Sequence, residues 1–201
     1  MKRRWVVGCF YTPEYEPIFR ENLQASCERL GVPLRFLALP SRKNWTANCG
    51  LKPTAALEIR TALGPDEWLV FLDVDAQVRA IPPVDDIPED CLMAARWLHR
   101  LGRETPEMLS GTLVIPPGPG PLEVLGAWQM MQEQRPERWD QRNLQDTVQF
   151  FPSAHMVELD ERWCWVMDLE MKIKGMTPQC PMEQAYIVHG QASRRMKDTI
   201  R

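Results

Sequence analysis

The stretch that decides the fold runs from Trp68 to Val78 and reads WLVFLDVDAQV. It begins with five aromatic, β-branched or aliphatic residues, and such a run is typical of a strand buried on both faces of a sheet. Asp73 and Asp75 follow it directly, at the strand end where open α/β sheets bind ligands. Side chains two residues apart on an extended backbone point the same way, so both carboxylates are predicted to face one hard cation, Mg²⁺ or Mn²⁺. A solvated turn is the simpler explanation for any Asp-x-Asp, but the buried strand in front of this one favours the metal.

The composition is that of an ordinary globular protein. The chain has 201 residues and a formal net charge of −3, which suits one domain and argues against nucleic-acid binding by overall charge. Six cysteines occur without a C-x-x-C pair, which favours free thiols in a reducing cytosol over a zinc site. No segment approaches the ~20 apolar residues of a membrane span, so we expect a cytoplasmic protein without a membrane anchor. Two local groups of basic residues remain, namely Arg96, His99, Arg100 and Arg103, and Arg135, Arg138 and Arg142.

Strands and helices are predicted to alternate along the first part of the chain, over residues 5–10, 17–30, 34–39, 53–63 and 68–72. This order is typical of a parallel sheet with helices on its faces. Right-handed crossovers then place the loops after Phe10 and Leu72 at the same edge. Residues 40–50 are predicted to form a polar loop. Beyond residue 80, strands are predicted at 91–97, 112–115, 156–159 and 186–189, and helices at 122–134 and 143–151.

Short motifs along the chain come in the order and approximate spacing found in nucleotide-sugar-dependent glycosyltransferases of the GT-A fold. They are Asp73-Val74-Asp75, Ser110-Gly111-Thr112, Asp140-Gln141 and His189-Gly190. The chain most resembles the retaining type, which has an early Asp-x-Asp and a metal-binding histidine near the C-terminus. The resemblance implies an α/β, GT-A-like, mostly parallel central sheet flanked by helices in a single compact domain. Residues 1–80 would form its nucleotide-binding half and residues 81–201 its acceptor-side half.

The same resemblance implies a metal centre and a donor site. Asp73 and Asp75 would hold Mn²⁺ or Mg²⁺ against the diphosphate of the donor, with His189 as the third ligand. Imidazole suits Mn²⁺ and its neighbours better than Mg²⁺. His189 could instead be a core histidine at a strand end, and His99 and His155 are interpreted as structural. Donor contacts are implied for Thr12, Tyr15, Lys52, Asp73, Val74, Ser110, Gly111, Trp163, Trp165, Gly190 and Lys197.

Asp140 and Gln141 resemble a pair that contacts the transferred sugar where the chemistry occurs, which makes them the candidate catalytic residues. Asp140 could instead be a helix N-cap, because Asp is common there. Lys52 could equally be an ordinary surface lysine. Thr12 could simply form a turn with Pro13, and Trp163 and Trp165 could be core residues. The basic residues Arg194, Arg195 and Lys197 could belong to a solvated tail.

The resemblance implies a metal-dependent glycosyltransferase, hexosyl- or pentosyl-transferring, that uses a nucleoside-diphosphate sugar with a family bias to UDP. A saccharide, a protein or a modified nucleobase in DNA could be the acceptor, the last because of the basic residues 96–103. A different Asp-x-Asp phosphate enzyme, a phosphatase or nucleotidyltransferase-like protein, is the first competing hypothesis. Haloacid-dehalogenase-like phosphatases carry Thr or Val where this chain has Gln77. The second competing hypothesis is a non-catalytic nucleotide-sugar-binding module.

Overall fold

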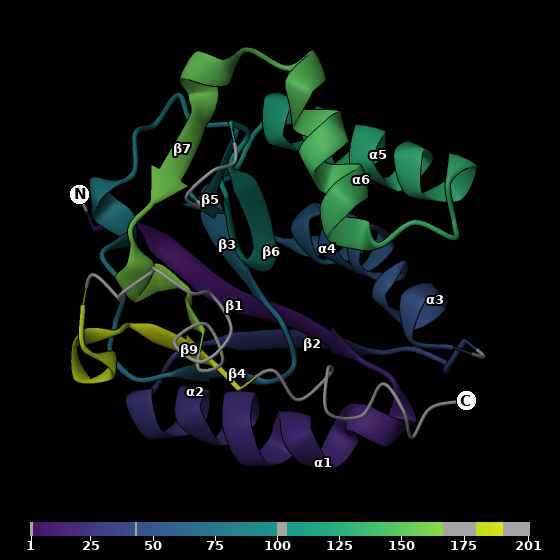
Figure 1. Cartoon of the computed structure of the whole chain (residues 1–201). Coiled ribbons are helices and arrows are strands. Elements are labelled where there is room, and N and C mark those ends of the chain that lie inside the picture. Colours follow the sequence, from purple (N-terminus) through teal and green to yellow (C-terminus); the bar gives the residue numbers. More distant parts are fainter. Residues whose placement is uncertain (1, 43, 100–103, 167–179, 191–201) are drawn as a thin grey trace.

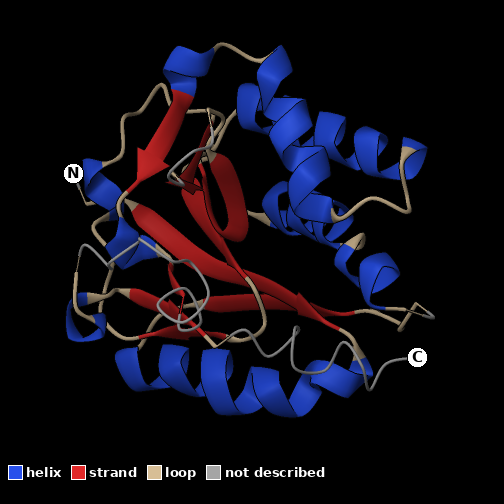
Figure 2. Ribbon diagram, in the orientation of Figure 1, coloured by secondary structure: helices blue, strands red, loops and turns tan. Residues whose placement is uncertain are grey.

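The computed structural model describes residues 2–42, 44–99, 104–166 and 180–190. Within these ranges a six-stranded sheet forms the centre, in the order β2-β1-β3-β6-β5-β7 (Figures 1 and 2). β1 pairs in parallel with β2 and β3, and β5 pairs in parallel with β7. β6 runs antiparallel to both β3 and β5. The predicted mostly parallel sheet is confirmed, with β6 as its reversed strand. The strand bounds are β1 Arg4–Tyr11, β2 Leu34–Ala38, β3 Glu67–Leu72, β5 Met93–Leu98, β6 Glu107–Ile115 and β7 Met156–Leu159.

Helices cover both faces of this sheet, with α1 and α2 on one side and α3 to α6 on the other (Figure 1). α1 and α2 are joined by a π-helical turn over Arg20–Gln24, so the helix predicted over 17–30 is continuous. No helix in the described ranges is long and apolar enough to cross a membrane. The helix bounds are α1 Glu16–Phe19, α2 Ala25–Leu30, α3 Trp45–Cys49, α4 Lys52–Ala62, α5 Pro119–Gln134 and α6 Asp140–Thr147. The short 3₁₀ turns are Pro13–Tyr15, Val84–Asp86, Val148–Phe150, Ser153–His155, Glu161–Trp163 and Met182–Gln184.

β3 is the central strand of the core, because its side chains alternate between the two helical layers. Trp68, Val70 and Leu72 pack in the cluster that includes α1 and α2. Leu69 and Phe71 pack in the other cluster, against α4, α5 and α6. All five are buried, which explains why the strand reads as an unbroken apolar run rather than an alternating one.

A second, three-stranded sheet has the order β4-β9-β8. Its strands are β4 Ala76–Val78, β8 Trp165–Val166 and β9 Ile187–His189. β4 follows the Asp-x-Asp turn and pairs antiparallel with β9, so that Ala76 lies opposite His189. This pairing brings the C-terminal histidine beside the two aspartates.

Several sequence-based boundaries were wrong. The predicted loop 40–50 contains α3, whose N-cap Asn44 accepts a hydrogen bond from the backbone nitrogen of Ala47 at 2.9 Å. The strand predicted from residue 112 extends back to Glu107. The helix predicted over 143–151 begins at Asp140 and ends as an α-helix at Thr147.

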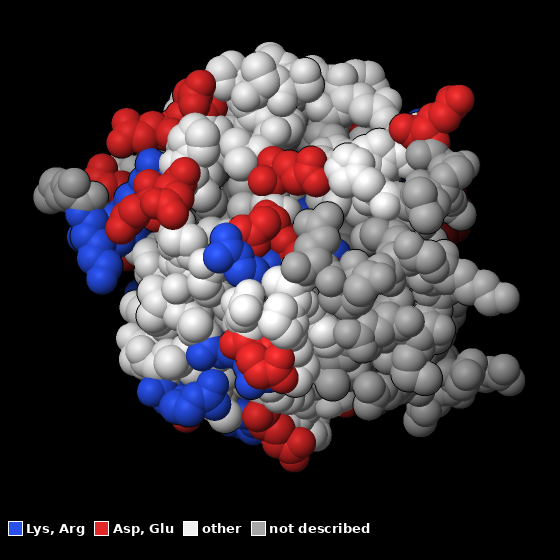
Figure 3. All heavy atoms as spheres, turned by 60° about the vertical axis from the view of Figure 1, so that its left-hand side comes forward, with Lys and Arg blue, Asp and Glu red and all other residues white. Residues whose placement is uncertain are grey.

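The predicted free thiols are confirmed, because all six cysteines are unpaired. Of the basic residues noted in the sequence, the described ones Arg96, Arg135 and Arg138 are engaged in ion pairs. The buried guanidinium of Arg96 lies 2.7 Å from Glu161, and Arg135 and Arg138 both pair with Asp146. Acidic and basic side chains are interspersed on the face drawn in Figure 3. Residues 100–103 lie outside the described ranges.

Two glycine-to-alanine substitutions, one at the end of α2 and one inside α5, should change the free energy of unfolding in opposite directions. Gly31 ends α2 with φ at 65°, in the left-handed region, so Gly31→Ala should lower the free energy of unfolding by about 1–2 kcal/mol. Gly126 lies inside α5, and a Cβ there meets nothing within 4 Å. Gly126→Ala should therefore raise the free energy of unfolding by about 0.5–1 kcal/mol. Urea denaturation of both variants measures the effect, and a shift of the same sign in both would contradict these helix assignments.

Candidate functional site

The turn between β3 and β4 presents the two aspartates. The backbone nitrogen of Asp73 donates to the carbonyl of Gly111 on β6 at 2.9 Å, and that of Ala76 donates to the carbonyl of Asp73 at 3.0 Å. Asp75 is buried and Asp73 is half-buried. These backbone bonds fix both carboxylates at the end of the central strand, as the sequence predicted.

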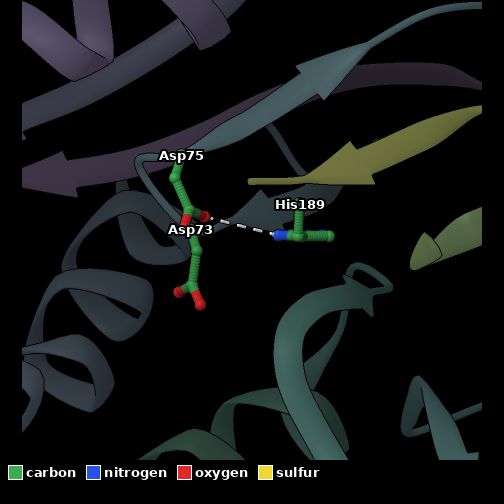
Figure 4. A group of neighbouring side chains, drawn as sticks. All are labelled: Asp73, Asp75 and His189. Carbon is green, nitrogen blue, oxygen red and sulfur yellow. Dashed lines mark ion pairs between the residues drawn. The ribbon is translucent and has the colours of Figure 1, made fainter. Parts of the chain in front are cut away.

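His189 completes a cluster with these carboxylates (Figure 4). One potential ligand atom from each of Asp73, Asp75 and His189 lies within 4.8 Å of the others. Nδ1 of His189 is 3.7 Å from Oδ1 of Asp75. The backbone nitrogen of Gly190 donates to the carbonyl of Asp75 at 3.3 Å. The structure therefore brings together the three residues predicted as metal ligands, although they come from two distant parts of the sequence.

Gly111 keeps the centre of this cluster open. A Cβ at this position would lie 3.2 Å from Cε1 and 3.4 Å from Nδ1 of His189, and 3.4 Å from Oδ2 of Asp73. Any larger side chain would fill the space between the ligand atoms. Two carboxylates and an imidazole are donors that Mn²⁺ accepts, and Mg²⁺ accepts the oxygens. The residues present thus fit a divalent cation.

The two carboxylates of the cluster lie close together, so positive charge nearby would stabilise them. Burial raises the pKa of the Asp73 carboxyl, the Lys52 ammonium opposes this, and Asp75 raises the pKa further. Burial alone would lower the pKa of His189, but the Cys164 sulfur and the Asp75 carboxylate outweigh burial and raise this pKa to about 10. Without a metal, these neighbours favour the doubly protonated, positively charged imidazole. A bound cation would take over the neutralising role of the second proton.

Lys52 is buried and lies between two carboxylates. Its Nζ is 2.7 Å from Oδ1 of Asp73, 3.0 Å from Oδ2 of Asp140 and 3.1 Å from Oγ of Ser110. The hydroxyl of Ser110 donates to the same Asp140 oxygen at 3.0 Å. Lys52 is therefore not the surface lysine that the sequence allowed. It links the start of α4 to the end of β3 and the start of α6.

Asp140 is fully buried and does not cap its helix. Trp139 holds the N-cap position of α6, and the indole Nε1 of Trp128 donates to the backbone carbonyl of Asp140 at 3.0 Å. Oδ2 of Asp140 meets Lys52 and Ser110, whereas Oδ1 has no hydrogen-bond partner among the described residues. A buried acceptor without a partner is costly, so Oδ1 of Asp140 is an unusual feature of this buried position.

The amide of Gln141 is oriented by Glu107. Its Nε2 donates to Oε1 of Glu107 at 2.9 Å, and its Oε1 accepts from the backbone nitrogen of Ser110 at 3.4 Å. Carboxylate oxygens accept hydrogen bonds, so Glu107 pairs with the nitrogen end of the amide. The sequence reasoning missed Glu107 because it began this strand at residue 112. A charged residue just ahead of a buried apolar strand could have drawn attention to it.

The remaining predicted donor contacts stay predictions. Thr12 and Tyr15 are buried in the turn after β1, and Val74 packs at the margin of the core. Trp163 is buried edge-on against Tyr186, with ring centroids 5.9 Å apart. Trp165 donates from Nε1 to the carbonyl of Cys180 at 3.3 Å. These contacts give both tryptophans a packing role. Arg194, Arg195 and Lys197 lie outside the described residues.

Solved structures with the same architecture include glycosyltransferases. One is a glycosyltransferase involved in the glycosylation of the major capsid of PBCV-1, with a TM-score of 0.67 and 14% sequence identity over 98% of both chains. Another is GlyE of Streptococcus pneumoniae TIGR4, with a TM-score of 0.62 and 16% identity over 94% of this chain and 55% of that one. A third is the galactosyltransferase LgtC in complex with donor and acceptor sugar analogs, with a TM-score of 0.56 and 12% identity over 96% and 94%.

The chain therefore has the GT-A fold of glycosyltransferases, as its motifs predicted. No protein-family model matches the sequence, and no curated protein matches it. At such low identities the structural likeness shows the fold, and an activity has to be argued from the residues of this chain.

Removal of the Lys52 ammonium tests the charge network. Lys52→Met leaves Asp73 and Asp140 without their shared cation, and breaking a buried ion pair costs about 3–5 kcal/mol. We expect that loss in the free energy of unfolding, measured by urea denaturation in EDTA. Arg20→Met, which removes an exposed pair with Glu16, is the control and should change stability little.

The double variant Lys52→Met with Asp140→Asn should regain part of the lost free energy of unfolding, because one of the two carboxylates left without a cation becomes a neutral amide. If the single Lys52→Met variant is as stable as the wild type, Lys52 does not stabilise the fold by neutralising Asp73 and Asp140.

Proposed function

We propose that this chain is a metal-dependent glycosyltransferase that moves a sugar from a nucleoside-diphosphate sugar, with UDP as the favoured nucleotide, to an acceptor hydroxyl. The observation that carries the proposal is the convergence of Asp73, Asp75 and His189 around a space that Gly111 leaves open. The shared fold with known glycosyltransferases supports it. The resemblance of the chain's motifs to retaining glycosyltransferases of the GT-A fold implies UDP and the retaining type.

The metal site would bind the diphosphate end of the donor. Mn²⁺ or Mg²⁺ held there would neutralise the charge that grows on the departing nucleoside diphosphate. Asp73, Asp75 and Nδ1 of His189 would be its protein ligands. The Lys52 ammonium, 2.7 Å from Asp73, would add fixed positive charge on the side facing α6. Thr12 and Tyr15, in the turn after β1, would contact the nucleoside.

Asp140 and Gln141 would meet the transferred sugar. The free Oδ1 of Asp140 would accept a hydrogen bond from a sugar hydroxyl, while Lys52 and Ser110 hold the other oxygen. Residues 1–80 would then form the donor half, and residues 81–201 the acceptor half. A saccharide or a protein is the favoured acceptor, because the burial of Arg96 weakens the case for DNA. The free thiols support work in the cytoplasm.

Loss of one carboxylate should abolish both donor binding and turnover. Asn at position 75 keeps the side-chain shape but not the charge that holds the metal, so Asp75→Asn should release no nucleoside diphosphate from any nucleotide-sugar with Mn²⁺. In wild-type protein, UDP should raise the melting temperature only with Mn²⁺ present. Ligand at about a hundred times its dissociation constant adds roughly 2.7 kcal/mol to the free energy of unfolding. A panel of nucleotide-sugars, assayed for release and by thermal shift, measures both.

Asp66→Asn is the matched control, because Asp66 is an exposed aspartate outside the cluster, and it should behave as wild type. Equal stabilisation by UDP in excess EDTA would contradict metal-assisted binding. Turnover at the wild-type rate by folded Asp75→Asn would contradict the metal role. Tight Mn²⁺-dependent binding, with neither release of nucleoside diphosphate from any donor nor transfer to added acceptors, would identify a binding module instead of an enzyme.

Binding of Mn²⁺ should tighten as the pH rises. Below a His189 pKa of about 10, the ion must displace a proton from the imidazole. The apparent dissociation constant should therefore fall by up to about tenfold per pH unit, and rise as the pH drops. Electron paramagnetic resonance of free Mn²⁺, between about pH 6.5 and about pH 8.5, measures this slope. His189→Gln should bind more weakly and with a shallower slope, whereas an unchanged slope would show that His189 is a structural histidine.

A further inference from the structure

We infer that Thr112 is a positioning residue for His189. The Thr112 hydroxyl accepts the hydrogen on Nε2 of the imidazole, which leaves Nδ1 as the nitrogen that faces the metal. Oγ1 of Thr112 lies 2.8 Å from Nε2 of His189, and Thr112 is fully buried. The inference rests on the proposed metal site and adds to it a residue outside the three ligands.

The two ring nitrogens of His189 have different surroundings. Nδ1 points toward Asp75 (Figure 4), 3.7 Å from its Oδ1, and a Cβ on Gly111 would touch this same nitrogen. Nε2 points toward Thr112. An imidazole binds a metal only through a nitrogen that carries no proton, and the hydrogen bond of the other nitrogen sets which one that is. The open space is on the Nδ1 side, so the hydrogen belongs on Nε2.

A threonine hydroxyl can accept this hydrogen while it donates its own proton elsewhere. Against the opposing effect of burial, His189 and Thr112 both lower the pKa of the Cys164 thiol, so the sulfur lies near them and can serve as that second acceptor. In this arrangement Thr112 accepts from the ring, and its own proton can go to the sulfur.

The strand pairing that fixes the aspartates also fixes Thr112. Thr112 pairs with Leu72, the last residue of β3, and the carbonyl of Gly111 accepts from the backbone nitrogen of Asp73. A shift of one residue in this pairing would turn the hydroxyl to the other face of the sheet. Three consecutive residues of β6 therefore contribute to the site. Ser110 forms hydrogen bonds with Lys52 and Asp140, and Gly111 leaves the open space. Thr112 contacts His189.

The test measures Mn²⁺ affinity directly, by electron paramagnetic resonance of the free ion with metal-free protein. Loss of such a partner typically weakens metal binding roughly 10–100-fold, and we expect that change for Thr112→Val, which keeps the shape and removes the hydroxyl. Thr112→Ser keeps the hydroxyl and should stay close to the wild-type affinity. Melting temperatures in EDTA show that each variant is folded. Thr112→Ala provides a second hydroxyl-free variant if valine prevents folding.

Thr147→Val is the matched control. Thr147 is also buried, and its hydroxyl donates to the carbonyl of Asn143 at 2.7 Å, within α6. This variant should lose stability but keep its affinity for Mn²⁺. Wild-type affinity in the hydroxyl-free Thr112 variants would overturn the inference and leave the metal site intact, as would equal losses in Thr112→Ser and Thr112→Val. A wild-type protein that binds no Mn²⁺ would overturn the metal site itself, and this inference with it.

Discussion

The requirement to neutralise buried carboxylates organises this molecule. The buried Asp75 and Asp140 and the half-buried Asp73 meet beside the central strand, where an unpaired buried charge costs several kcal/mol per ion. Lys52 forms ion pairs with Asp73 and Asp140, and His189 pairs with Asp75. Each cation comes from a different element, so charge pairing joins α4, β3, α6 and β9 around one point. The site and the packing of these elements are therefore one arrangement.

Much of the fold could be predicted because local sequence determines it. The apolar run before Asp73 is explained by β3, whose side chains fill both helical layers, and Gly31 ends its helix in the expected left-handed conformation. Asp73, Asp75 and His189 could be proposed as a group from a resemblance of spaced motifs, although spacing alone places none of them in space.

The parts that could not be predicted depend on contacts between distant segments. Strands as short as β4 and β8 have little propensity of their own and exist because β9 pairs with them. Asp140 looked like a helix cap because only the folded chain brings Lys52 and Ser110 to it. Arg96 looked like part of a basic surface, and the partner that buries it, Glu161, lies far along the chain. Glu107 and Thr112 gain their roles in the same way.

In the proposed metal site, the pairing of Ala76 with His189 would couple binding of the ion to completion of folding. Contacts between residues so far apart in sequence carry a large loop-closure entropy and form slowly. A partly folded chain with β3 in place would present two carboxylates but no imidazole, and would hold the ion weakly. An ion that binds only the finished site stabilises the native state by mass action. The supply of metal ions would then influence how much of the newly made chain persists in its folded form.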